Sequence, residues 1–219
     1  MSLASSEVVI LLHGLARSAA SMKKMEAALK REGYLTLNCD YPSRVDSVEV
    51  LAEETISQAL LSCEREYKPT KIHFVTHSMG GILVRYYLSK HNIANLGRVV
   101  MLSPPNKGSE IVEKLGHLRV YKWLNGIAGQ QIGASADSLP NRLGAVNYEV
   151  GVIIGNKSIN LLLSLLIDGA NDGKVSVARA KVEGMSDFLV MPVCHPVIMR
   201  SQKVISQTCA FLKQGQFQR

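Results

Sequence analysis

The sequence has few cysteines, and the four it has lack the spacing of metal ligands: Cys39, Cys63, Cys194 and Cys209. Cys39 and Cys63 lie in segments with apolar patterns, which predicts buried free thiols in a reducing compartment. The chain also lacks a basic start followed by a long apolar segment, so no signal peptide is visible. These absences predict a cytoplasmic protein, an expectation that a leader trimmed from the N-terminus would change.

Signatures of cofactors and nucleic acids are missing as well. The sequence shows no internal repeat, no low-complexity tract, no cluster of metal-ligating residues and no glycine-rich loop for phosphate. We therefore expect no cofactor and no metal. Lys and Arg total 25 against 18 Asp and Glu, a net charge of +7. The basic residues are scattered and not interleaved with aromatics, so nucleic acid is not an expected partner. They favour either a solvated surface or transient contact with an anionic membrane surface, and the oligomeric state stays open.

Short apolar strands alternate with helical patterns along the chain. Strands are predicted at Val8 to Leu12, at Leu35 to Cys39, and near Ile72, Val99, Val150 and Phe188. Helices are predicted over residues 18–32, over residues 48–63, from Ile82 onward, and from Ile198 towards the C-terminus. Apolar strands that alternate with helices are typical of a parallel sheet covered on both faces. We predict one domain over residues 1–219, an α/β fold with about six mostly parallel strands. Its functional loops should meet at the carboxyl ends of the strands.

The strongest functional signal is the segment Thr76-His77-Ser78-Met79-Gly80-Gly81, which joins a predicted strand to a predicted helix. A nucleophile elbow occupies this position in an α/β sheet. A serine on so sharp a turn presents its hydroxyl above the sheet, and the following glycines let the helix pass close behind the strand. The usual pattern has glycine where Thr76 stands, and threonine fits there if it faces away from the turn. The segment predicts a nucleophilic Ser78 and hence a serine hydrolase, with an ordinary turn as the alternative.

Residues that would complete a catalytic set follow later in the chain. The polar loop over residues 168–175 offers Asp168 and Asp172, and each either orients a histidine or caps a turn. Of the six histidines, only His195 lies downstream of this loop, between a predicted strand and the terminal helix. A lone histidine there is more often structural. The order of Ser78, an acid and His195 is nevertheless one known order of a catalytic triad.

Together these segments resemble the small bacterial lipases and esterases of the α/β-hydrolase superfamily, and the resemblance covers nearly the whole chain. Its carriers are His13-Gly14-Leu15, His77-Ser78-Met79-Gly80-Gly81, Ser103-Pro104-Pro105-Asn106-Lys107-Gly108-Ser109, Asp172-Gly173-Lys174-Val175 and His195. The acid loop of related lipases has the form Asp-Gly-x-Val, which favours Asp172 over Asp168. The chain departs from the family at Thr76 and in the longer segment that separates the Val150 strand from Asp172.

The resemblance implies a hydrolase of carboxylic esters that acts on a small-molecule acyl ester or a lipid. Ser78 would attack the carbonyl carbon, His195 would accept its proton, and Asp172 would hold the imidazole. The backbone N–H groups of Leu15 and Met79 would form the oxyanion hole. Supporting positions in the same motifs are His13, Gly14, His77 and Gly80. Two alternatives stay open: a thioesterase or acyltransferase with the same triad, and a catalytically silent fold that binds an acyl ligand or a protein.

The segment from about residue 110 to residue 147 fits the alternation of strands and helices least well, because it mixes short apolar groups with several glycines. In related enzymes an insertion at this place covers the acyl site. We therefore predict a small cap that moves about its glycines, with a fixed helical excursion as the alternative. The apolar run from Leu161 to Ile167 either faces the acyl chain or belongs to the core, and it is too short to span a membrane.

Overall fold

The computed structural model describes residues 6–160 and 164–219, and its centre is a six-stranded sheet. The strand order is β2-β1-β3-β4-β5-β6, and every neighbouring pair is parallel. The bounds are Glu7–Leu12 for β1, Leu35–Cys39 for β2, Lys71–His77 for β3, Leu96–Leu102 for β4, Val150–Gly155 for β5 and Asp187–Met191 for β6. The predicted α/β fold with about six parallel strands is confirmed.

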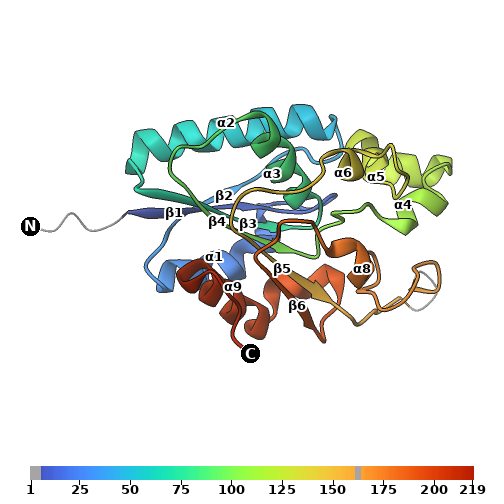
Figure 1. The fold of residues 1–219 in the computed structure, drawn as a ribbon. Coiled ribbons are helices and arrows are strands. Elements are labelled where there is room, and N and C mark those ends of the chain that lie inside the picture. Colours follow the sequence, from blue (N-terminus) through green and yellow to red (C-terminus); the bar gives the residue numbers. More distant parts are fainter. Residues whose placement is uncertain (1–5, 161–163) are drawn as a thin grey trace, which may run out of the picture.

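Helices cover both faces of the sheet, with α2 and α3 on one face and α1 and α9 on the other (Figure 1). The bounds are Ala19–Met22 for η1, Lys23–Arg31 for α1, Val48–Tyr67 for α2, Met79–Lys90 for α3, Glu110–Leu115 for α4, Arg119–Gln131 for α5, Leu139–Arg142 for α6, Val177–Ala180 for α8, His195–Arg200 for η2 and Gln202–Gln214 for α9. Both η1 and η2 are 3₁₀ helices.

Each of the predicted helices differs from the structure at a boundary. The helix predicted over 48–63 extends to Tyr67, and the one predicted over 18–32 is divided into η1 and α1. The helix after the elbow begins at Met79 rather than Ile82, because the turn at Ser78 leads straight into helical backbone. The C-terminal helix pattern is divided into η2 and α9, because Ser201 between them adopts an extended conformation with φ −69° and ψ 125°. Apolar spacing reports which face is buried, so it does not register a one-residue break of this kind.

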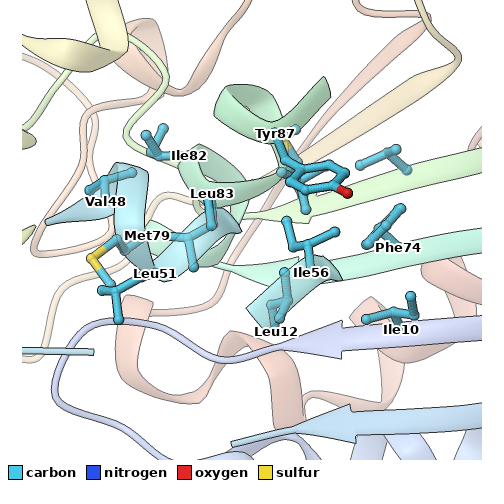
Figure 2. Packing of buried hydrophobic residues seen from close by; sticks show 14 of the residues in the cluster. Ile10, Leu12, Val48, Leu51, Ile56, Phe74, Met79, Ile82, Leu83 and Tyr87 are labelled. Atoms are coloured by element: carbon cyan, nitrogen blue, oxygen red, sulfur yellow. The ribbon is translucent and has the colours of Figure 1, made fainter. Parts of the chain in front are cut away.

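Strand β1 is apolar from Val8 to Leu12 because each of its faces meets helices. In β1, Val8, Ile10 and Leu12 pack in the cluster beneath α2 and α3, whereas Val9 and Leu11 pack in the cluster beneath α1 and α9. Figure 2 shows part of the first cluster, where Ile10 and Leu12 lie among residues of α2 and α3. Complete burial of one aliphatic side chain contributes about 1.5–3 kcal/mol. This packing fixes the strands whose carboxyl ends carry the loops described below.

The start of α3 lies directly against the end of β1. A Cβ atom on Gly80 would lie 2.8 Å from the carbonyl oxygen of Leu12 and 2.8 Å from that of His13. Only glycine fits this approach without displacement of the backbone. Thr76 is fully buried beneath the same helix, and a Cβ atom on Gly81 would come 3.3 Å from its Oγ1. The structure therefore accommodates threonine in place of the usual glycine at this position.

The predicted cap segment, residues 110–147, contains α4, α5 and α6 and lies beyond the carboxyl ends of the strands (Figure 1). Gly126 interrupts α5 with φ 65°, and a Cβ atom there would lie 1.9 Å from the carbonyl oxygen of Arg44. Gln131, the last residue of α5, accepts a hydrogen bond from the Val48 N–H (2.7 Å) and donates one to Glu49 (2.6 Å). These contacts join α5 to the loop after β2 and to the first turn of α2.

Candidate active site

The elbow holds Ser78 in a strained backbone conformation. Its φ of 53° and ψ of −122° lie in a region that residues with a side chain rarely adopt. The Ser78 N–H donates to the carbonyl oxygen of Leu102 at the end of β4 (2.8 Å). On the other side, a Cβ atom on Gly14 would come 3.0 Å from the Ser78 Cβ and 2.8 Å from the His77 Nδ1. The loop after β1 and the elbow are therefore in close contact, and this contact requires glycine at position 14.

Three predicted residues from three separate loops meet at this elbow. The Ser78 hydroxyl lies 3.1 Å from the Nε2 of His195, and the Nδ1 of His195 lies 2.8 Å from the Oδ2 of Asp172. The exposed fractions are 9% for Ser78, 4% for His195 and 0% for Asp172. A carboxylate only accepts hydrogen bonds, so Nδ1 carries the proton and Nε2 is free to accept from the serine hydroxyl.

Asp172 is fixed by its own loop before it contacts His195. Its Oδ1 accepts hydrogen bonds from the backbone N–H groups of Lys174 (3.0 Å) and Val175 (2.9 Å). Burial alone would raise the pKa of Asp172, but the charge and hydrogen bond of His195 outweigh burial, so the pKa lies below its usual value. Asp172 is therefore a carboxylate at neutral pH. The alternative acid, Asp168, is exposed and has no contact with His195.

The two loops that carry Asp172 and His195 meet at the end of β5. The His195 N–H donates to the Asp172 carbonyl oxygen (3.0 Å). A Cβ atom on Gly155, the last residue of β5, would lie 2.1 Å from the Val193 carbonyl oxygen and 3.0 Å from the Asp172 Cβ. Glycine at this position allows both loops to pack against the end of β5.

His77 supports the backbone of His195. It is buried, and its Nε2–H donates to the carbonyl oxygen of His195 (3.1 Å). Burial, followed by the charges of His195 and Arg17, holds the pKa of His77 well below its usual value. His77 is therefore neutral at pH 7, with its proton on Nε2. Its contact is with the backbone of His195 rather than with the imidazole–carboxylate pair.

His13 fixes the loop after β1. The ring is fully buried and stacks on Tyr41 with ring centroids 4.1 Å apart. Its Nδ1–H donates to the Gly14 carbonyl oxygen (2.9 Å), and its Nε2 accepts from the Tyr41 N–H (3.4 Å). Burial lowers the pKa of His13, in agreement with a neutral ring that both donates and accepts.

Two backbone N–H groups beside the elbow are available to a ligand. Within the described chain, neither the Leu15 N–H nor the Met79 N–H donates to an acceptor. Met79 is the first residue of α3, where backbone N–H groups lack partners inside the helix and the helix dipole is positive. Its side chain is fully buried in the cluster beneath α2 (Figure 2), so the core anchors the position of this N–H.

Ser78 and His195 open into a pocket of about 420 Å³. Apolar side chains of the cap segment line one part of it, namely Ile111, Val112, Leu115 and Ile132. Three cationic residues line another part: Arg17, Arg44 and Lys174. Sequence reasoning did not single out any of these lining residues, although Lys174 stands inside the quoted acid loop. Arg17 lies three positions after Gly14, and this closeness to the loop motif was the one sequence signal that it could line the site.

The remaining expectations concern other parts of the chain. Of the apolar run 161–167, residues 161–163 lie outside the described residues, Leu165 is exposed, and the buried Ile167 does not line the pocket. All four cysteines are free thiols, with Cys63 buried and Cys39 half-buried. Among the described residues, no group of three or more His, Cys, Asp or Glu side chains is arranged to hold a metal ion. No described helix combines the length and apolar character needed to cross a membrane.

Comparison by sequence gives one family match. A family described as "Putative serine esterase (DUF676)" matches residues 3–124, slightly more than half of the chain. This region contains the loop after β1 and the elbow at Ser78, and it stops before Asp172 and His195. No curated protein sequence matches the chain.

Comparison of the fold finds lipases and esterases. The Bacillus licheniformis lipase BlEst2 in its mature form matches with a TM-score of 0.72 and 17% identity, over 97% of this chain and 93% of that one. The Legionella pneumophila phospholipase PlaB matches with a TM-score of 0.70 and 17% identity, over 94% of this chain and 57% of that one. The Pyrococcus furiosus esterase Pf2001 matches with a TM-score of 0.66 and 19% identity, over 96% of this chain and 83% of that one.

The relatives differ from this chain in length. The propeptide form of the Bacillus lipase matches with a TM-score of 0.75 and 18% identity over 99% of this chain, which spans only 51% of that longer protein. At these identities the likeness concerns the fold. It confirms the α/β-hydrolase fold and the resemblance to bacterial lipases and esterases that the motifs indicated.

Proposed function

Because the chain belongs to the serine esterase family DUF676, we propose that it hydrolyses carboxylic esters through Ser78, His195 and Asp172. One observation carries the proposal: a line of hydrogen bonds runs from the Ser78 hydroxyl through His195 to Asp172, at a strained elbow that opens into a pocket. An ordinary turn needs neither the strain nor the buried acid. This observation also speaks against a catalytically silent fold.

The chemistry follows from the positions of the protons. The Nε2 of His195 takes the hydroxyl proton as the Ser78 oxygen attacks the ester carbonyl carbon, and a tetrahedral oxyanion forms. Asp172 stabilises the resulting imidazolium and stays ionised. His195 returns the proton to the departing alkoxide, which leaves as the alcohol. Water then loses a proton to His195 and attacks the acyl-serine, and collapse of the second intermediate releases the acid and restores the Ser78 hydroxyl.

The oxyanion of both intermediates needs hydrogen-bond donors that stand in place before the reaction. We assign this role to the backbone N–H groups of Leu15 and Met79, which have no other acceptor in the described chain. Loss of one such donor typically lowers the rate about a hundredfold or more. Because both donors belong to the backbone, His13, Gly14, His77 and Gly80 act through the positions of the loop and the elbow.

We further propose a single domain over residues 1–219, in which residues 110–147 form a cap over the acyl site. The apolar residues of α4 and the end of α5 in the pocket lining support this part of the proposal. The substrate is accordingly an acyl ester or a lipid. Thioesters share the chemistry of attack, but no feature of the pocket favours them over oxygen esters.

The proposal is tested by replacement of the nucleophile. A fluorophosphonate should add once to the parent protein, with the adduct on Ser78, and should not add to Ser78→Ala. Hydrolysis of a short p-nitrophenyl ester should fall on the order of ten-thousandfold or more in this variant. Ser89→Ala, at the exposed end of the same helix α3, serves as the control and should keep both activities. Undiminished ester hydrolysis by Ser78→Ala would refute the assignment.

A further inference from the structure

The pocket beside Ser78 combines apolar and cationic side chains and lacks acidic ones. The apolar residues come from the cap, whereas Arg17 follows the loop after β1 and Lys174 belongs to the acid loop. No Asp or Glu side chain stands among the described residues that line the pocket. A pocket that served only a neutral acyl ester would need the apolar residues and the triad, but not the cations.

Neither Arg17 nor Lys174 is directly paired with an acid in the described chain. Within the described chain, neither side chain forms an ion pair or a hydrogen bond. The acid closest in sequence to Lys174 is Asp172, which is fully buried. Both of its oxygens are already occupied, one by His195 and the other by two backbone N–H groups. Arg17 is half-buried and Lys174 is exposed where both line the pocket, so both side chains are open to a ligand.

The two cations act on each other and on His77, which packs beside His195. Loss of water lowers the pKa of Lys174 and the charge of Arg17 lowers it further, whereas the charge of Asp172 raises it in part. Burial, followed by the charge of Arg200, lowers the pKa of Arg17. Both cations also lower the pKa of His77, whose ring lies 4.9 Å from that of His195. A negative charge brought by the substrate would offset the repulsion between Arg17 and Lys174.

We propose that the preferred ester carries an anionic group, a phosphate or a carboxylate, which binds to Arg17 and Lys174 while the acyl chain packs against the cap. The inference rests on the proposed esterase function and adds the chemical class of the substrate. Arg supplies a planar pair of donors and Lys a point charge, a combination that suits an anion with several oxygens. The bound anion would also offset the repulsion between the two cations.

Matched substrates test the proposal. Hexanoylglycerol phosphate and hexanoylglycerol differ only by the phosphate, on the alcohol side of the ester. The p-nitrophenyl monoesters of glutaric acid and of pentanoic acid differ by a carboxylate on the acyl side. All four are used below the concentration at which they aggregate, so that a charged lipid surface plays no part. In at least one pair the anionic ester should have a kcat/KM about tenfold or more above the neutral one, which is the discrimination typical of hydrogen bonds to a charged group. The pair that shows the preference identifies the side on which the anion binds.

Variants show whether these two cations cause the preference. Arg17→Gln and Lys174→Gln should each lower the ratio of anionic to neutral kcat/KM about tenfold. Arg17→Lys keeps the charge, so its ratio should lie between those of Arg17→Gln and the parent protein. Lys203→Gln, which removes one exposed charge from α9, should leave the ratio unchanged. Equal rates on both members of both pairs would overturn the proposal, as would a preference that Arg17→Gln leaves intact.

A binding measurement separates this proposal from the proposed function. Calorimetry should detect binding of the preferred anionic ester to the Ser78→Ala variant. Addition of Arg17→Gln to this variant should weaken the binding about tenfold or more. Inorganic phosphate serves as the second probe, and it should bind only weakly because it lacks the acyl chain. If the fluorophosphonate labels Ser78 but anionic and neutral esters react at equal rates, the proposed esterase function stands and the proposed anionic substrate is refuted. Absence of labelling together with charge-dependent binding would refute the esterase and retain the anion site.

Discussion

At the scale of single residues, the hydrogen bonds around His195 determine which of its nitrogens carries the proton. Asp172 accepts from Nδ1, and His77 donates to the His195 carbonyl oxygen, so the ring and its backbone are both held. This arrangement leaves Nε2 to accept from Ser78. The rate of a serine hydrolase depends on this tautomer, because only an unprotonated Nε2 can remove the hydroxyl proton.

Replacement of Asp172 by asparagine tests this point. The amide can donate a hydrogen bond to Nδ1, which favours a proton on Nε2, the wrong nitrogen for catalysis. We expect kcat for a neutral ester to fall about a thousandfold to ten-thousandfold, with a smaller change in KM. Steady-state kinetics on the folded variant provide the measurement.

The matched control for this substitution is Asp168→Asn, which changes the exposed acid of the same loop. It should leave kcat within about twofold, because Asp168 has no contact with His195. Equal losses in the two variants would contradict the assignment of Asp172 as the residue that orients His195.

At the scale of elements, the decisive contact is that between the first turn of α3 and the end of β1. The elbow places Ser78 between two strands. The Ser78 N–H donates to the Leu102 carbonyl oxygen of β4, and Gly80 packs against the carbonyl groups at the end of β1. A shift of α3 away from β1 would move the Met79 N–H together with the serine. The packing of one helix on one strand thus sets the geometry of Ser78.

Gly80→Ala should disturb this contact. The added Cβ would lie within 2.8 Å of two backbone oxygens that belong to a buried strand end and cannot easily move. We expect a loss of about 1–3 kcal/mol in the free energy of unfolding and a marked loss of fluorophosphonate reactivity. Urea unfolding and the rate of labelling measure the two effects.

Gly81→Ala provides the comparison on the next residue of the same helix. Its Cβ would meet its nearest neighbours at 3.3 Å, a contact that a small adjustment relieves. The loss in the free energy of unfolding should be much smaller for Gly81→Ala than for Gly80→Ala, because alanine also favours helical backbone by about 1 kcal/mol over glycine. If Gly81→Ala were the more damaging change, close approach to β1 would not explain the need for glycine at position 80.

At the scale of the whole molecule, burial of histidines makes stability depend on pH. Burial lowers the pKa of His13, His73 and His77 in the folded protein. The unfolded chain has ordinary values near 6.5, so it binds protons below that pH which the folded chain does not bind. Stability is therefore fully present above about pH 7 and falls as the pH decreases through the histidine range.

The free energy of unfolding should accordingly decrease between about pH 7 and pH 5, by up to about 1.4 kcal/mol per pH unit for each of the three histidines. Asp172, whose folded pKa is lowered, stabilises above the unfolded value of about 4 and loses this effect only at lower pH, outside this window. Urea unfolding at several pH values measures the slope. His77→Gln should reduce the slope by about one proton. A stability that rises on acidification would contradict the expected sign.

The sequence by itself determined the sheet. Strands β1 and β5 consist almost entirely of apolar residues and glycine because helices cover both of their faces, and this pattern can be read without coordinates. The elbow was also readable, since a serine followed by two glycines between a strand and a helix meets a local steric demand. The start of α3 and the division before α9 could not be predicted from the sequence, because a backbone turn hardly changes the spacing of apolar residues.

Only the tertiary structure decided which residues meet at the site. Asp172 and Asp168 are equally polar and stand in the same loop, and the fold brings just one of them within 2.8 Å of His195. The cations at Arg17 and Lys174 are unremarkable among 25 basic residues until the loops after β1 and β5 place them around one pocket. Local patterns record burial and turns, whereas contacts between distant loops depend on how the ends of parallel strands are arranged. That arrangement exists only in the folded chain.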